Sequence, residues 1–315
     1  MAIEISIIIP TFNRPTNLQR AIDSVIKQTF KNWELIIVDD NNPNTQSRFE
    51  TERLLERYCK LDKRIKYIKH NKNKNGAAAR NTGIKLAKGK YIAFLDDDDE
   101  YLPNKLKLQY ELLENSRNKC YGGVYSGFYI IRNKKIFKVF DEIKTGAFIK
   151  ETLACEFEMG SGSNLFIRKE IIEELNGFDE SFQRHQDYEF LVRFFEKYKL
   201  LAIDKPLFNV EQSSNHLNLP DSEKAYEYRM KYINKFKNLL NTMNKSDVLE
   251  IYHKNFIDLS QLALKERKYK LAFSWFKKAV SYKYISVKEL LRLVILLIYS
   301  LLPERIRRKI TFVRV

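Results

Sequence analysis

The sequence predicts an α/β fold, in which a mostly parallel, twisted sheet carries helices on both faces, followed by an all-helical C-terminal appendage. Short apolar segments alternate with amphipathic helical patterns over the first hundred residues, as in a parallel sheet with crossover helices. Beyond Pro220 the pattern is helical throughout. The chain has 315 residues, more than one average domain, so we divide it into residues 1–220 and 221–315.

Four apolar segments in the first part are short and bounded by polar or turn residues, as buried strands are. They are Ile5–Ile9, Leu35–Val38, Ile65–Ile68 and Tyr91–Leu95. A helix is expected after the first segment, with Thr16 as its N-cap and Gln19 three residues later. Residues 120–220 combine strand, loop and helix patterns.

The C-terminal part contains two further capping patterns, which place helix starts after Asp247 and Ser286. Between them, the spacing from Tyr269 to Ala279 matches one helix of a tetratricopeptide repeat. Because the match occurs once, a plain helical hairpin is the favoured interpretation.

The net charge is +16, and most of the excess lies in the last third of the chain. Residues 221–315 contain 21 basic and 9 acidic side chains, whereas residues 1–220 contain 35 and 31. Three cysteines lie far apart without metal-ligand spacing, which favours a reducing, cytoplasmic location. No apolar stretch is long enough to span a bilayer.

Polar residues follow the predicted strands where parallel α/β sheets bind ligands, beyond the carboxyl ends. Pro10–Arg14 follows the first strand, Asp39–Asn42 the second and Asp96–Asp99 the fourth. Adjacent carboxylates repel one another, and a divalent cation such as Mg²⁺ or Mn²⁺ held by Asp96 and Asp98 would relieve that repulsion. A solvated acidic turn is the alternative.

Two other residues have both a binding and a structural interpretation. Asp40 is placed to accept hydrogen bonds from a ribose or a base, or to cap a turn. Arg80 lies in the small-residue segment Gly76–Gly83, where a guanidinium can meet a phosphate, although a lone arginine is more often a surface residue.

Taken together and in order, these motifs resemble the inverting family 2 glycosyltransferases, whose catalytic domain has the nucleotide-sugar-binding GT-A fold. The resemblance covers roughly residues 3–216. The segments that carry it are Ser6–Asn13, Glu34–Asn41, Gly76–Gly83, Gly89–Asp99 with Pro103 and Leu106, Gly177–Glu180 and His185–Glu189.

The resemblance implies a set of donor-binding residues. Thr11 and Asp40 would hold the nucleoside, Arg80 would lie near the diphosphate, and Asp97 near the ribose or donor sugar. The implied metal ligands are Asp96, Asp98 and His216.

Asp187 matches the general base of the family. The family often has an acid directly before that base, whereas this chain has Gln186, so the base is expected to be tuned differently. A single carboxylate and a cation suffice for this reaction, because a cation-bound nucleoside diphosphate leaves without protonation.

We therefore expect a metal-dependent transferase that moves a sugar from a nucleotide donor, a UDP-sugar, to a glycan or lipid-linked acceptor in cell-surface polysaccharide synthesis. A sugar nucleotidyltransferase is one alternative, but Pro10–Arg14 lacks the glycines that cradle a triphosphate. A basic nucleic-acid-binding protein is another, but the aspartates at the ligand edge would repel a phosphate backbone.

The end of the chain suggests a membrane contact. Leu290–Leu302 is very apolar but too short to span a bilayer, and a basic cluster follows it at Arg305, Arg307, Arg308 and Lys309. We expect a peripheral anchor on the cytoplasmic face of the membrane. The alternative is that this helix packs on the preceding hairpin or forms an oligomer interface.

Overall fold

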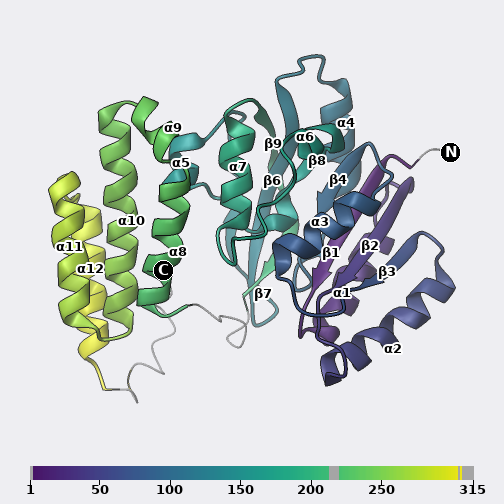
Figure 1. Cartoon of the computed structure of the whole chain (residues 1–315), viewed down its shortest axis with the longest axis horizontal. Helices are drawn as coiled ribbons and strands as arrows, with labels where there is room; N and C mark the ends of the chain where they lie inside the picture. Colours follow the sequence, from purple (N-terminus) through teal and green to yellow (C-terminus); the bar gives the residue numbers. More distant parts are fainter. Residues whose placement is uncertain (1–2, 213–219, 304–305, 307–315) are drawn as a thin grey trace. The chain divides into compact units, whose positions relative to one another are not determined.

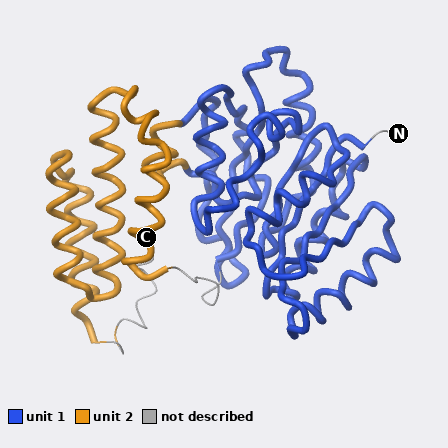
Figure 2. The backbone as a smooth tube through the Cα atoms, viewed as in Figure 1, with its two compact units in different colours: residues 1–148, 158–217 blue, residues 149–157, 218–315 orange. Residues whose placement is uncertain are grey.

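The computed structural model describes residues 3–212, 220–303 and 306, and it divides into two compact units (Figure 2). The first unit comprises residues 1–148 and 158–217, and the second comprises residues 149–157 and 218–315.

The first unit is built on one sheet with the strand order β3-β2-β1-β4-β8-β6-β9-β5, in which β7 pairs with β6 (Figure 1). The strands are β1 (Ile5–Thr11), β2 (Trp33–Asp39), β3 (Ile65–Lys69), β4 (Tyr91–Phe94), β5 (Glu100–Tyr101), β6 (Tyr121–Arg132), β7 (Lys135–Phe140), β8 (Phe166–Arg168) and β9 (Lys199–Glu211). All four predicted strands are present.

Helices cover both faces of the sheet, because successive side chains of a buried strand point to opposite sides. Ile5, Ile7 and Ile9 of β1 pack in one core with side chains of α1, α2 and α4. Ile8 points the other way, where a Cβ on Gly83 of α3 would lie only 2.5 Å from its Cγ2. The helices of this unit are α1 (Pro15–Ile26), α2 (Gln46–Leu61), α3 (Gly76–Leu86), α4 (Lys105–Asn115), α6 (Lys169–Glu174) and α7 (Gln186–Phe195).

The predicted α/β fold is therefore confirmed, with one addition and one correction. Strands β1, β2, β3 and β4 pair with one another in parallel. Strands β5, β7 and β8 run antiparallel to the strands they pair with. Thr16 is not an N-cap: α1 begins one residue earlier at Pro15, whose fixed φ suits the first helical position.

The second unit is helical. Its helices are α5 (Ile149–Leu153), α8 (Ser222–Lys235), α9 (Lys237–Thr242), α10 (Lys245–Lys265), α11 (Tyr269–Tyr282) and α12 (Val287–Leu301). A core that includes Phe256, Trp275 and Leu296 joins α10, α11 and α12. Hydrogen bonds from Tyr232 and Asn255 to carbonyls of α5 attach that short helix to this unit.

The two predicted capping boxes have different outcomes. Ser286 forms both bonds of a capping box with Glu289, and α12 begins at the next residue. The prediction for Asp247 is wrong, because α10 already begins at Lys245 and Asp247 lies in its first turn. None of the helices within the described residues is long and apolar enough to cross a membrane.

Candidate active site

A cavity of about 420 Å³ opens where the carboxyl ends of β1, β2 and β4 meet the starts of α3 and α7. Six of the residues predicted from sequence line it, although they are widely separated in the chain. They are Thr11, Asp40, Arg80, Asp96, Asp97 and Asp98. The parallel strands account for this convergence, since their carboxyl ends share one edge of the sheet.

Arg80 is the buried cation of the cavity. Its Nη2 donates a hydrogen bond to Oδ1 of Asp96 at 2.6 Å, while its buried Nη1 has no hydrogen-bond partner among the described residues. A Cβ at Gly76 would lie 3.3 Å from Nη1, and one at Gly162 would lie 3.1 Å from Nη2, so these glycines leave room for the guanidinium. A buried donor without a partner at a cavity wall is suited to bind an anion.

Asp97 and Asp98 converge on Arg14, whose Nη1 lies 3.1 Å from Oδ1 of Asp97 and 2.7 Å from Oδ2 of Asp98. Asp97 also accepts a hydrogen bond of 2.8 Å from Thr11 Oγ1. Burial raises the pKa of Asp97 to about 7; Arg14 opposes this shift and the charge of Asp98 adds to it. The two carboxylates thus share one cation in this structure, the guanidinium of Arg14.

Asp99 has a structural role at the back of the acidic turn. Its buried carboxylate accepts hydrogen bonds from the hydroxyls of Ser161 and Ser163, the latter at 2.6 Å. Ser163 Oγ in turn accepts a bond from the amide of Asp96. Burial and the charges of Asp96 and Asp98 raise the pKa of Asp99 well above its usual value.

Asp40 is buried and holds the segment of residues 70–75 in place. Its Oδ1 contacts His70 Nδ1 at 2.7 Å and accepts from the amide of Lys74 at 2.8 Å. Its Oδ2 accepts from Asn73 Nδ2 and from the amide of Asn75, both at 2.9 Å. These four contacts use the acceptor sites that a carboxylate ordinarily has. A nucleobase could therefore contact Asp40 directly only by replacing one of these four partners.

Asp187 lies in the first turn of α7, directly after Gln186, which lines the cavity. Burial raises the pKa of Asp187; the charge of Arg80 opposes this shift and that of Asp96 reinforces it. The Oε1 of Gln186 is buried without a hydrogen-bond partner among the described residues. The predicted base therefore interacts electrostatically with the cavity's cation and with the acidic turn.

The predicted metal ligands do not form one group in this structure. Asp96 pairs with Arg80 and Asp98 pairs with Arg14, while His216 lies outside the described residues. Within the described parts of the chain, no three His, Cys, Asp or Glu side chains are arranged to hold a metal ion. The fit to a cation rests on the donor set, since Asp96 and Asp98 present hard oxygen ligands that each already pair with a positive charge, Asp96 with Arg80 and Asp98 with Arg14.

Sequence reasoning missed several residues that complete the cavity. Arg14 and Glu211 both line it, as do Ser161 and Arg184. Arg14 was within the predicted ligand-edge segment Pro10–Arg14, but nothing in the sequence pairs it with the acidic turn. Glu211 comes from the end of β9, whose place beside β6 is decided by tertiary pairing.

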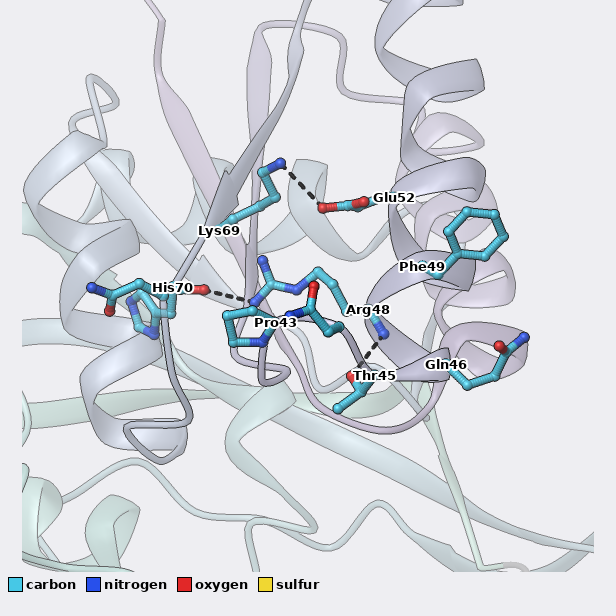
Figure 3. Close-up of a pocket in the computed structure, with 10 residues that line it drawn as sticks. Pro43, Thr45, Gln46, Arg48, Phe49, Glu52, Lys69 and His70 are labelled. Atoms are coloured by element: carbon cyan, nitrogen blue, oxygen red, sulfur yellow. Dashed lines mark hydrogen bonds and ion pairs between the residues drawn. The ribbon is translucent and has the colours of Figure 1, made fainter.

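A second cavity, of about 560 Å³, lies between the end of β3 and the start of α2 (Figure 3). Arg48 crosses it and donates to the backbone oxygens of His70, Asn41 and Asp39. Lys69 pairs with Glu52 at its rim at 3.1 Å. These groups tie the end of β3 to α2, so we assign this cavity a structural role.

The α/β fold agrees with comparisons to known proteins. The model of the family described as "Glycosyl transferase family 2" matches residues 6–175, which is more than half of the chain and includes the first strand, α3 and the acidic turn. The chain belongs to glycosyl transferase family 2. This membership decides among the three functions left open by the sequence.

Two curated glycosyltransferases illustrate the relationship. A Campylobacter jejuni enzyme, GalNAc(5)-diNAcBac-PP-undecaprenol β-1,3-glucosyltransferase, is 27% identical over 99% of this chain and 98% of its own length. The Escherichia coli enzyme WfgD, a UDP-Glc:α-D-GlcNAc-diphosphoundecaprenol β-1,3-glucosyltransferase, is 38% identical over 42% of this chain and 48% of its own length.

The fold of this glycosyl transferase family 2 member also matches solved structures. That of Staphylococcus aureus TarS residues 1–349 in complex with UDP-GlcNAc superimposes with a TM-score of 0.56, covering 88% of this chain and 89% of that chain. Its sequence identity is 14%, so the likeness concerns the fold.

Proposed function

We propose that this chain transfers a sugar from a UDP-sugar to a hydroxyl of a lipid-linked acceptor, with inversion at the anomeric carbon, in cell-surface polysaccharide synthesis. The observation that carries the proposal is the buried Arg80, whose Nη1 has no hydrogen-bond partner within the described residues. Against the effect of burial, the charges of Asp96 and Asp187 both raise the pKa of its guanidinium. A cation with an open donor suits a diphosphate, and a nearby carboxylate suits an acceptor hydroxyl.

In the proposed reaction, Asp187 takes the proton of the acceptor hydroxyl. The acceptor oxygen then bonds to the anomeric carbon as the bond from that carbon to the diphosphate oxygen breaks, and the electron pair stays on the diphosphate. Arg80 offsets the negative charge that accumulates there. Because burial raises its pKa, Asp187 is a stronger base than an exposed aspartate.

The donor is proposed to lie along the acidic edge. Thr11 and Asp97 form one hydrogen-bonded unit there, which we assign to the ribose and sugar, and Asp98 is the candidate ligand for Mn²⁺ or Mg²⁺ together with Asp96. When bound, such a cation would supply further charge neutralisation for the diphosphate. Asp40 contributes by holding residues 70–75 beside the nucleoside.

The names of two relatives support a lipid-linked acceptor and a uridine nucleotide. Both the C. jejuni and E. coli enzymes are named for undecaprenol-linked diphosphate acceptors, and the latter for UDP-glucose. We propose that residues 1–220 carry out the transfer and that residues 221–315 bring the chain to the cytoplasmic face of the membrane.

The described part of α12 supports that second assignment. One side of the helix packs Leu293 and Leu296 into the core of the unit, while a row of large apolar side chains remains exposed. That row contains Leu290, Leu291, Val294, Ile295, Leu297, Ile298 and Leu301. The predicted basic cluster at Arg305, Arg307 and Arg308 lies outside the described residues.

A nucleotide panel tests the proposal. Purified protein is heated with UDP, GDP, CDP and ADP, each with and without Mn²⁺, and UDP is expected to raise the melting temperature most because a ligand stabilises the state that binds it. UDP-sugars are then screened for transfer to an undecaprenyl-diphosphate-linked sugar. Equal stabilisation by all four nucleotides, or none, would contradict the assignment of the donor.

A further inference from the structure

The hairpin of β6 and β7, residues 128–140, is unusual for a sheet edge because it is both apolar and basic. It turns at Asn133 and Lys134, which both have positive φ, and β7 then pairs with β6 alone among the described strands (Figure 1). At the far end from the turn, Phe140 stacks on Phe128 at 4.4 Å between ring centres, which ties the base of the hairpin to the core.

Away from that base, β7 presents large apolar side chains to solvent. Ile136 is 58% exposed, Phe137 is 55% exposed and Val139 is 42% exposed. Lysines on an edge strand are by themselves a common protection against pairing with another strand, but a strand protected in that way does not need three exposed apolar residues. The combination therefore indicates a contact surface.

The charge of this surface is of one sign. Residues 128–140 contain four basic side chains and no acidic one: Arg132, Lys134, Lys135 and Lys138. Asp141 and Glu142 follow only after β7 has ended at Phe140, the end opposite the turn. The guanidinium of Arg132 lies 3.7 Å from the ring centre of Phe137, so a cation and an exposed aromatic ring occupy one spot.

The hairpin lies at the rim of the candidate active site. In the parallel pairing of β6 with β9, Ile130 is opposite Val210 and Ile131 is opposite Glu211, and both β9 residues line the cavity. Arg132 fixes this arrangement by donating to Oε1 of Gln212 from Nε at 3.1 Å and from Nη2 at 2.9 Å. The basic and apolar turn therefore lies directly beyond the end of a strand that forms the cavity wall.

We infer that the β6–β7 hairpin docks on an anionic lipid surface and thereby brings lipid-borne acceptors to the cavity. Apolar side chains next to lysines match the boundary between acyl chains and negatively charged head groups. This inference rests on the proposed function for its acceptor, but its surface belongs to the first unit and is separate from the exposed row of α12. The phosphates of the lipid head groups are the groups that the four cations recognise.

A site-specific probe tests the inference in the full chain. The chain's own tryptophans, Trp33 and Trp275, are buried, so a Phe137→Trp variant adds one exposed reporter. We expect its emission to shift to the blue with phosphatidylcholine–phosphatidylglycerol vesicles and to be quenched when the lipids are brominated. Phe49→Trp, at an exposed phenylalanine of α2, is the matched control and is expected to show neither change.

Charge reversal separates this contact from that of α12. In the Phe137→Trp chain, adding Lys134→Glu, Lys135→Glu and Lys138→Glu should weaken reporter insertion by roughly 10²-fold, about five-fold for each lysine. UDP binding, measured by calorimetry on the same protein, should not change. If the Phe137→Trp chain binds UDP normally but its fluorescence does not change with vesicles, this inference alone is overturned. If the unsubstituted chain does not bind UDP, the proposed function is overturned.

A second copy of the chain is the competing occupant, since β7 pairs with β6 alone among the described strands and its other edge could pair with another strand. In that case the emission of the Phe137→Trp variant would shift with protein concentration in the absence of vesicles, and ultracentrifugation would show a dimer. That result would also overturn the lipid assignment.

Discussion

Substitution of Asp187, the proposed base, is expected to separate chemistry from binding. Asp187→Asn keeps the size of the side chain but removes the basic oxygen, so transfer should fall by roughly 10²–10⁴-fold while UDP affinity stays within a few-fold of the original. Initial rates of UDP release and calorimetric UDP binding measure the two effects. Asp204→Asn, at an exposed position on β9, is the matched control, and equal effects of the two substitutions would remove Asp187 from the mechanism.

Arg14 is expected to control metal binding because its guanidinium pairs at 2.7 Å with Asp98, one of the two proposed metal ligands. Arg14→Ala should therefore increase Mn²⁺ affinity in the absence of nucleotide, and Arg14→Lys should restore part of the competition. Loss of the signal of free Mn²⁺ in electron paramagnetic resonance measures this affinity without any turnover.

The Mn²⁺ binding measurement can also contradict this prediction. If Mn²⁺ binds Arg14→Ala no more tightly than the original chain, the acidic turn is not the metal site. Asp98→Ala in the Arg14→Ala background is the control, since it should abolish any gain.

Asp97 should make stability depend on pH. Its pKa is raised to about 7 in the folded chain from 3.8, so between these values the folded state binds more protons than the unfolded state. The contribution of Asp97 to the free energy of unfolding should therefore be fully present at about pH 4 and below, fall as the pH rises to about 7, and be lost above that. Asp97→Asn should flatten this slope, which urea unfolding at pH 5 and pH 8 would show. An unchanged slope would mean that Asp97 does not hold the proton.

At the scale of single elements, α12 and α10 provide a matched pair, because the sequence predicts the same capping box for both and the structure contains only one. Ser286→Ala should lower the stability of the second unit by about 1 kcal/mol, since the hydroxyl caps the amide of Glu289. Asp247→Ala should change it by a few tenths at most, because the ion pair of 3.7 Å that Asp247 forms with Lys150 is partly exposed to solvent.

Urea unfolding followed by tryptophan fluorescence measures the stability of the Ser286→Ala and Asp247→Ala variants, since Trp275 lies in the core to which α12 contributes. Equal losses in the two variants would show that the difference in capping geometry has no energetic consequence.

In the sheet, the positions of the first four strands can be predicted from sequence, whereas the partners of the later strands cannot. Buried parallel strands such as Ile5–Thr11 are mainly apolar segments, so their positions along the chain follow from the local sequence. Strands β6 and β9 pair in parallel although they are far apart in the chain, and β8 lies antiparallel between β4 and β6. No local pattern encodes those partners.

For the whole molecule, the net charge of +16 and the exposed row of α12 predict binding to anionic vesicles. The triple substitution Leu291→Ser, Ile295→Ser and Ile298→Ser should reduce co-sedimentation without lowering the melting temperature, because all three side chains are exposed. Added salt should weaken binding as it screens the charges. Phe49→Ser on α2 is the control for loss of an exposed apolar side chain.

If the chain instead stays in the supernatant at low salt, the membrane assignment for the C-terminal part fails. Ultracentrifugation then decides whether the exposed row of α12 joins two copies, and the triple variant should be monomeric in that case.

The sequence by itself determined the class of fold, the positions of the first four strands and the residues Thr11, Asp40, Arg80 and Asp96–Asp98 that line the cavity. Strand burial and the polar segments that follow the strands are local properties of the chain. The choice of Thr11 and Asp97 within those segments, and the role of Arg80, came from the resemblance to the family 2 glycosyltransferases. Tertiary structure alone decided that Arg14 pairs with Asp97 and Asp98, that Asp40 is occupied by residues 70–75, and that α5 belongs to the helical unit. The reason is physical. Each of these results depends on contacts between segments that are distant in the sequence, and such contacts form only when the chain has folded.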